Sequence, residues 1–459
     1  MAQSNAANAV QNLFRTPELK DKILFTLLCL LVYRIGAAVT APGINPQAIA
    51  DYINQQSNGG GLLGLYNLFT GGQLARATVF ALGIMPYISA SIFQQIAQAV
   101  VPQVDKMSKD EEGRKKINQY SRYATVVLAA VQAWGFAIFA ESIPGAVATP
   151  GFGFRVTMAF FLTVGAIFVM WLGEQITERG IGNGASLMIF FSIVERIWPG
   201  IMASFSFVST GAVGAFSLLV LIIMMVAVVG SVVAVTMAAR RVLIQIPQRT
   251  MARGRQREAS RSFIPLRINS SGVMPIVFAQ SVIVMPGAFA QFMGNTKARD
   301  FADMLAPGTT IYYILSAILI MFFTYFYTSI IFNPIDLAEN LKKQGGFIPG
   351  VKPGAKTAEY IDDVVSKITL PGALFLTAVA LLPIWISKAI NVPFNFGGTS
   401  LLIVVGIALD TIQQLNQHLL LRKYDGFMKK GRVRFRGRQG APGGFSSVRS
   451  YWLLVAGCW

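Results

Sequence analysis

Ten long apolar stretches, joined by polar segments, constrain this chain more than any other feature of its sequence. They lie at about residues 23–41, 74–101, 122–141, 156–174, 184–206, 214–238, 272–293, 309–332, 369–387 and 397–418. An α-helix needs about 20 predominantly apolar residues to cross a bilayer, and an isolated strand cannot span lipid because its backbone groups would stay unpaired. The pattern therefore predicts an all-α integral membrane protein with ten transmembrane helices.

The composition excludes several other classes of protein. Of the 459 residues, 54% are hydrophobic and 13% are charged, about half the charged share of a typical soluble domain and too apolar for intrinsic disorder. The two cysteines, Cys29 and Cys458, and the single histidine, His418, oppose a disulfide framework, a zinc site and a histidine-based catalytic pair. Because the sequence also holds no nucleotide-phosphate motif, we expect neither a cofactor nor an enzymatic activity.

The distribution of positive charge predicts the orientation in the membrane. If successive stretches alternate in direction, 32 of the 39 Lys and Arg residues fall on one side and five on the other. The richer side consists of residues 1–22, 102–122, 174–184, 240–267, 333–369 and 418–459. Since positively charged loops stay in the cytoplasm, both termini are predicted to be cytoplasmic. The net charge of +18 favours contact with anionic lipid, RNA or an acidic protein.

Ten spans divide into an N-terminal half, residues 1–213, and a C-terminal half, residues 214–430. An odd number of spans in each half inverts the second half relative to the first, as in inverted-repeat transporters. We therefore expect two inverted five-helix halves. The remaining residues, 431–459, form a basic and then atypical tail.

Two of the apolar stretches are unusually polar for helices that face lipid. Residues 74–101 contain one proline, three glutamines and two serines, and residues 272–293 contain two prolines, two glutamines and a serine. These residues fit either helix packing with local hydrogen bonds or a shared polar path. An ion-coupled solute transporter of the inverted-repeat type remains an alternative. The scarcity of carboxylates within the spans opposes it, because such transporters use buried carboxylates as relays.

Two segments between the spans allow more than one interpretation. Residues 59–72, GGGLLGLYNLFTGG, are too few to cross the membrane. They form either a re-entrant or surface loop, or a movable element with glycine hinges that occludes a path from outside. Residues 240–267 contain eight arginines and one acidic residue, Glu258. They serve either as a topology determinant at anionic headgroups or as a docking surface for RNA or an acidic partner.

Five motifs in order resemble the bacterial SecY family, the channel-forming subunits of the Sec protein translocon. They are FALGIMPYISASI at 80–92, WLGEQITERGIGNGASL at 171–187, FIPLRINSSGVMPIVFA at 263–279, NPIDLAENLKKQGGFIPGVKPG at 333–354 and GGTSLLIVVGIALD at 397–410. The resemblance covers about residues 13–430. It implies a SecY-like fold with a central pore and a protein-conducting channel in the bacterial cytoplasmic membrane. Such a channel passes unfolded secretory polypeptides across the membrane and releases apolar segments laterally into it.

The resemblance also implies roles for individual residues. An apolar pore ring would consist of Ile84, Ile88, Ile189, Val277 and Ile403. Residues 59–72 would form an external plug, with the large side chains Leu62, Leu63, Leu65, Tyr66, Leu68 and Phe69. A lateral gate between the second and seventh spans would carry the polar groups Ser89, Gln132, Gln280 and Ser281.

The cytoplasmic loops 240–271 and 333–369 would dock the ribosome, through ribosomal RNA, and the SecA motor ATPase. The candidate contacts are Arg255, Arg257, Arg267, Lys342, Lys343 and Lys352. Further implied partners are the small membrane subunits SecE and SecG, client polypeptides with signal sequences, and anionic lipids. The chain departs from the family at Lys352, where an arginine is usual, so the planar fork of a guanidinium is lost. Residues 440–459 match nothing expected in the family.

Overall fold

The computed structural model describes residues 17–57, 61–209, 215–246, 260–269, 271–292, 296–389 and 398–430. The chain divides into two compact units, residues 1–412 and 413–459. All predicted pore, plug and gate residues lie in the first unit. The predicted tail, residues 431–459, lies outside the described residues.

The predicted N-terminal half contains eight described helices. They are α2 (Pro17–Gly36), α3 (Pro46–Ser57), α4 (Leu62–Phe69), α5 (Met85–Val100), α6 (Pro102–Lys109), α7 (Glu111–Glu141), α8 (Phe152–Arg179) and α9 (Gly184–Ser209). The C-terminal half contains α10 (Ala215–Met237), β1 (Ala239–Ile246), β2 (Ser260–Arg267), α11 (Met274–Phe292), α12 (Thr296–Met304), α13 (Thr310–Ile331), α14 (Pro334–Lys343), α15 (Ala355–Ala389) and α16 (Gly398–Lys430).

Each of the ten predicted apolar stretches contains a helix, so the predicted helical membrane bundle is confirmed. The ten helices are α2, α5, α7, α8, α9, α10, α11, α13, α15 and α16. Five helical runs among the described residues could cross a membrane by length and composition alone. They are Glu111–Glu141, Phe152–Arg179, Thr310–Lys343, Ala355–Ile386 and Thr399–His418.

The order of helix packing repeats between the two halves. In the first, α2 packs on α8, α5 on α7, and α7 on α8; in the second, α10 packs on α15, α11 on α13, and α13 on α15. If the spans are numbered within each half, both halves pair the first span with the fourth, the second with the third, and the third with the fourth. The repeat agrees with two five-helix halves of one architecture. The halves meet where α11 packs against α4, α5 and α7, and where α10 packs against α9.

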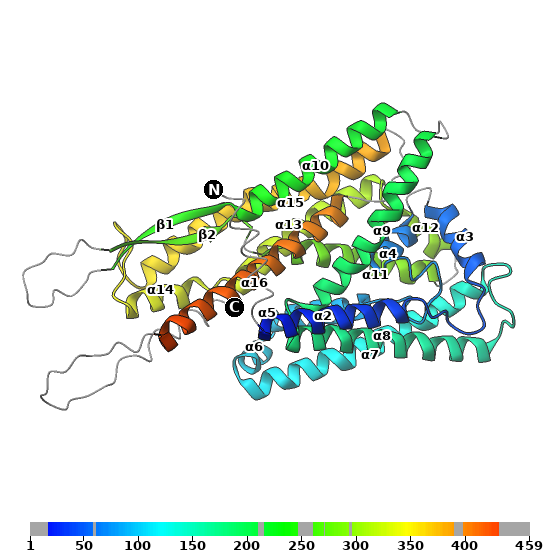
Figure 1. Cartoon of the computed structure of the whole chain (residues 1–459), viewed down its shortest axis with the longest axis horizontal. Coiled ribbons are helices and arrows are strands. Elements are labelled where there is room, and N and C mark those ends of the chain that lie inside the picture. The colour runs from blue at the N-terminus through cyan, green and yellow to red at the C-terminus, as the bar shows by residue number, and fades with distance from the viewer. Residues whose placement is uncertain are drawn as a thin grey trace, which may run out of the picture. The chain divides into compact units, whose positions relative to one another are not determined.

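The arginine-rich loop contains an antiparallel hairpin that the sequence analysis did not predict. Strands β1 and β2 pair from Ala239 opposite Arg267 to Ile246 opposite Ser260. The hairpin, α14 and the start of α15 share a small hydrophobic core of Val242, Ile244, Leu266, Leu341, Ile348 and Ile361. Figure 1 shows the hairpin and α14 at one end of the first unit, and α3 and α12 at the opposite end. The predicted loop 333–369 is therefore a packed structure, because it contains α14 and the first turns of α15.

The second predicted stretch is not helical throughout, which corrects its boundary. Helix α5 begins at Met85, and residues 70–84 form consecutive turns. Gly71, Gly72 and Gly83 have φ angles of 68°, 84° and 57°, a region that glycine adopts without steric cost. The turns end at Ile84, the N-cap residue of α5. They therefore position the first predicted pore residue.

Candidate channel site

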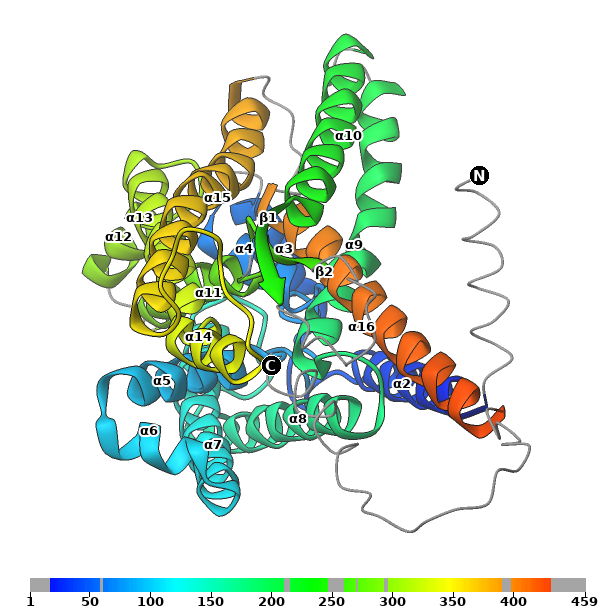
Figure 2. The same cartoon turned by 90° about the vertical axis from the view of Figure 1, so that its left-hand side faces the viewer.

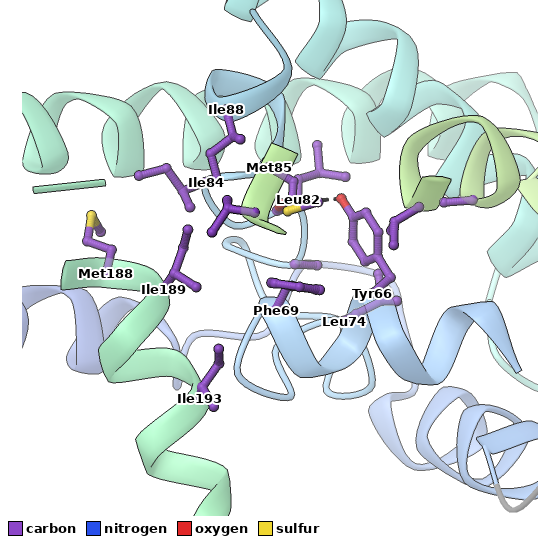
Figure 3. Close-up of a cluster of buried hydrophobic side chains, with 14 of the residues drawn as sticks. Tyr66, Phe69, Leu74, Leu82, Ile84, Met85, Ile88, Met188, Ile189 and Ile193 are labelled. Carbon is purple, nitrogen blue, oxygen red and sulfur yellow. Dashed lines mark hydrogen bonds between the residues drawn. The ribbon is translucent and has the colours of Figure 1, made fainter. Parts of the chain in front are cut away.

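The five predicted pore-ring residues are all buried in one hydrophobic cluster. Each is at most 5% exposed. Ile84 and Ile88 belong to the start of α5 and Ile189 to α9, whereas Val277 lies on α11 and Ile403 on α16. Figure 3 shows Ile84, Ile88 and Ile189 approaching the same region from two helices. The cluster thus draws aliphatic side chains from both halves of the bundle.

The chemistry of these side chains suits a seal. Aliphatic groups offer no ligands to ions, and a constriction that they line resists wetting. A glycine of α16 allows close packing next to these side chains. A methyl group at Gly406 of α16 would overlap the side chain of Val273, next to α11. A larger residue at position 406 would therefore require the Val273 side chain to move.

The predicted plug segment contains the short helix α4. Leu62, Leu63, Tyr66, Leu68 and Phe69 are buried, whereas Leu65 is partly buried. The helix packs against α3, α9 and α11. Figure 2 shows α4 in the middle of the surrounding helices. The described part of the predicted plug is therefore a packed apolar helix rather than a surface loop.

Individual contacts hold α4 against the C-terminal half and the turns before α5. The side chain of Leu62 touches Gly287 of α11 so closely that a methyl group at that glycine would overlap it. The ring of Tyr66 meets Phe292 edge to face, with centroids 6.5 Å apart. The Tyr66 hydroxyl donates to the Leu82 carbonyl oxygen over 3.3 Å. Burial raises the pKa of Tyr66 above its ordinary value, so this hydroxyl keeps its proton.

The four predicted gate residues are buried where α5, α7 and α11 pack together. Ser89 donates to the Met85 carbonyl over 3.1 Å, and Ser281 donates to the Val277 carbonyl over 2.8 Å. These are local helix bonds, as the packing interpretation expects. The glutamines differ, because Oε1 of Gln132 and Nε2 of Gln280 have no hydrogen-bond partner among the described residues.

The gate region also contains a residue that the sequence analysis missed. Tyr312 of α13 donates from its hydroxyl to Oε1 of Gln280 over 3.3 Å. Its side chain is fully buried. The tyrosine follows Gln280 by 32 positions, so no local pattern could have connected the two.

The described docking candidates lie on the surface around the small hydrophobic core of β1, β2, α14 and the start of α15. Arg267 ends β2, and Lys342 and Lys343 end α14; all three are exposed. Lys352 is exposed and accepts at its carbonyl a hydrogen bond of 2.9 Å from the Thr357 hydroxyl. Arg255 and Arg257 lie outside the described residues.

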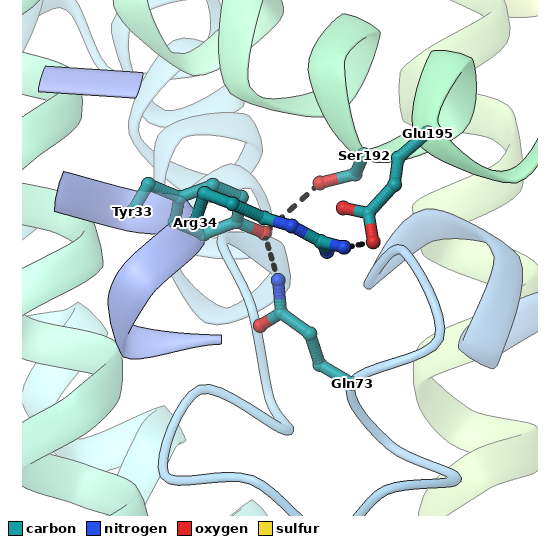
Figure 4. A network of polar contacts seen from close by, with 5 residues as sticks. All are labelled: Tyr33, Arg34, Gln73, Ser192 and Glu195. Carbon is teal, nitrogen blue, oxygen red and sulfur yellow. Dashed lines mark hydrogen bonds and ion pairs between the residues drawn. The ribbon is translucent and has the colours of Figure 1, made fainter. Parts of the chain in front are cut away.

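A polar network around the turns after α4 was also missed by the sequence analysis. Arg34, which lies within the apolar stretch 23–41, forms an ion pair with Glu195 of α9. The neighbouring Tyr33 hydroxyl lies 2.9 Å from Oγ of Ser192 and accepts from Nε2 of Gln73 over 2.7 Å. Figure 4 shows this network between α2, α9 and the turns after α4. No group of three or more His, Cys, Asp or Glu side chains that could hold a metal occurs among the described residues.

A bundle of long apolar helices around a buried hydrophobic core defines the class of polytopic α-helical membrane proteins. Within that class, the SecY family model matches residues 78–412. The protein translocase subunit SecY of Aquifex aeolicus is 43% identical over 427 residues, which cover 91% of this chain and 98% of the relative. The chain belongs to the SecY family.

Solved structures agree on the fold. One, described as a protein-conducting channel, has a TM-score of 0.63 at 17% identity and covers 91% of this chain and 95% of its own. Canine Sec61 in a ribosome–channel complex has a TM-score of 0.59, also at 17% identity, with the same coverage. The ten-helix channel fold expected from the sequence is therefore confirmed. The chain is a multi-pass protein-conducting channel subunit, and the ion-coupled transporter alternative is not supported.

Proposed function

We propose that Ile84, Ile88, Ile189, Val277 and Ile403 form the pore ring through which an unfolded secretory polypeptide passes. The observation that carries this proposal is that all five side chains are buried in one hydrophobic cluster. Both halves contribute side chains to this cluster. In the resting channel the ring and the plug, residues 59–72, together close the path. A passing chain displaces the plug and spreads the flexible aliphatic side chains, which then close around it.

The two halves, residues 1–213 and 214–430, separate at the lateral gate to admit signal sequences and release apolar segments. Support comes from the packing of α11 against α5 and α7, which is one of the contacts between the halves. Oε1 of Gln132 and Nε2 of Gln280, which have no hydrogen-bond partner among the described residues, add a further reason. A buried polar atom without a partner costs about 1–3 kcal/mol, so this contact is weaker than a fully apolar one. Apolar client segments leave sideways because lipid solvates them better than water does.

The chain catalyses no reaction of its own in this proposal, and partners supply the driving force. A ribosome or the SecA ATPase docks on the cytoplasmic surface formed by β1, β2 and α14. Docking of a ribosome is supported by canine Sec61, which has the same fold and is described in a ribosome–channel complex. We further propose SecE and SecG as membrane partners, anionic lipids at the basic loops, and a bacterial cytoplasmic membrane with both termini inside. If the protein is purified from native membrane and no small subunit co-purifies, the assignment of SecE and SecG as partners is contradicted.

Reversing charge at the end of α14 tests the docking surface. The double substitution Lys342→Glu and Lys343→Glu should lower translocation of a secretory client into proteoliposomes at least about fivefold, because like charges repel an acidic partner surface or RNA. The measurement compares client protected from protease, with SecA and ATP supplied, at low and high salt. The matched control is Lys297→Glu on α12, an exposed lysine at the opposite end of the unit. Equal translocation by all three proteins would contradict the docking assignment.

A further inference from the structure

The plug helix ends in a glycine cap that fixes how the chain leaves it. The Gly72 amide donates to the Asn67 carbonyl over 2.8 Å, and the Gly71 amide donates to the Leu68 carbonyl over 3.1 Å. This pair of bonds, with a left-handed glycine between them, is the Schellman arrangement. The Asn67 side chain adds a third bond, since its Oδ1 accepts from the Ala75 amide over 3.0 Å. The C-terminal end of α4 is thus ordered by its own backbone.

Arg196 of α9 holds the same end from outside. Its Nη1 donates to the Asn67 carbonyl over 3.2 Å. The guanidinium also covers Gly72, because a Cβ added there would lie 3.4 Å from Cζ and Nε. The last carbonyls of a helix carry partial negative charge, so a cation at this position is favourable. The contact is to the backbone and does not depend on which side chain residue 67 carries.

A second set of contacts holds the residues that follow. Gln73 donates to the Tyr33 hydroxyl of α2, which in turn lies within hydrogen-bond distance of Ser192 of α9. Ser192 packs against Gly71, where an added Cβ would lie 3.1 Å from the serine Cβ. Both helices belong to the N-terminal half. The opposite end and the middle of the plug helix touch the C-terminal half, through Leu62 against Gly287 and Tyr66 against Phe292.

We propose that Tyr33, Ser192 and Arg196 form a latch that keeps the C-terminal end of the plug attached to the N-terminal half. When the halves separate, contacts to α11 break first and the plug swings about its latched end. The three residues are positioning residues: they contact the plug and the turn after it, not the passing polypeptide. The inference rests on the proposed plug role of residues 59–72 and adds to it the point about which the plug moves.

The test measures plug exposure in the resting channel. A cysteine is placed at Leu65, with both native cysteines replaced by alanine, and is labelled by a membrane-impermeant maleimide from the external side. Arg196→Gln should raise the labelling rate and the resting ion conductance about tenfold, as loss of a hydrogen bond to a charged donor predicts. Tyr33→Phe, which removes only a hydroxyl, should raise both about threefold. Arg196→Lys should fall between wild type and Arg196→Gln, because the planar fork is lost but the charge remains.

The control is Arg155→Gln, which removes an ion pair with Glu141 away from the plug. This substitution should leave the labelling rate and the resting ion conductance unchanged. The latch proposal is overturned if the Arg196→Gln and Tyr33→Phe channels still translocate a client and show the labelling rate and resting ion conductance of the wild type. Deletion of residues 62–69 separates this failure from failure of the plug proposal. If the deletion itself leaves conductance unchanged, the plug assignment is wrong; if only the deletion raises it, the latch alone is wrong.

Discussion

Replacing Ile84 and Ile88 with serine should make the resting channel leak ions. The two residues are four positions apart at the start of α5 and are buried in the central cluster. Keeping one isoleucine out of water is worth about 1.5–3 kcal/mol. Hydroxyl groups at these positions would stabilise water and ions in the constriction. Since each 1.4 kcal/mol is a factor of about ten, the resting conductance should rise roughly tenfold or more.

The measurement is single-channel or bulk ion conductance of the purified channel in planar bilayers without a client. Val226→Ser is the matched control, because Val226 of α10 is 67% exposed on the outside of the bundle. It should leave conductance at background. Background conductance in the Ile84→Ser, Ile88→Ser protein would show that these residues do not seal the path.

Replacing Gly165 with alanine should destabilise the whole N-terminal half. This glycine of α8 is buried, and a methyl group there would overlap the carbonyl oxygen of Val79. The neighbour is backbone and cannot rotate away, so α8 or the turns 70–84 must shift. Overpacking of this kind costs about 1–3 kcal/mol or more. Because the same turns lead to Ile84, the resting leak should rise together with the loss of stability.

The matched control is Gly230→Ala in α10, where no atom lies within 4 Å of the added methyl group. It should be neutral or slightly stabilising, since alanine favours the helix by about 1 kcal/mol over glycine. Thermal unfolding midpoints of the purified proteins in one detergent give the comparison. Equal midpoints for the two variants would mean that α8 does not pack against these turns as described.

Hydropathy was sufficient to predict the ten helices, because each must bury about 20 apolar residues in lipid regardless of its neighbours. It failed where turns precede the helix α5. Residues 74–84 are apolar enough to be mistaken for the start of a span, although positive φ angles at Ala77 and Gly83 place them in turns. The hairpin β1–β2 was missed because its arginines obscured the apolar side chains, Val242, Ile244 and Leu266, that it buries.

Site residues were predicted through motifs, since a buried isoleucine in a pore resembles one in any core. The family resemblance supplied all five ring positions; the structure places all five in the hydrophobic core, and their role in a ring stays a prediction. The polar network could not have been predicted in the same way. Tyr33 and Ser192 are 159 positions apart, and both lie in apolar stretches where a lone hydroxyl is unremarkable. Only the packing of α2, α9 and the turns after α4 brings the two hydroxyls together.

The central claim is that aliphatic side chains from both halves surround the moving polypeptide at one level. Photocrosslinking to a client stalled midway through the channel tests it most directly. The photoreactive probe is placed singly at Ile84, Ile88, Ile189, Val277 and Ile403, with Val226 as the exposed control. We expect crosslinks from all five positions to one short window of the client, and none from the control. Crosslinks confined to a single half, or to client windows far apart, would contradict a common ring.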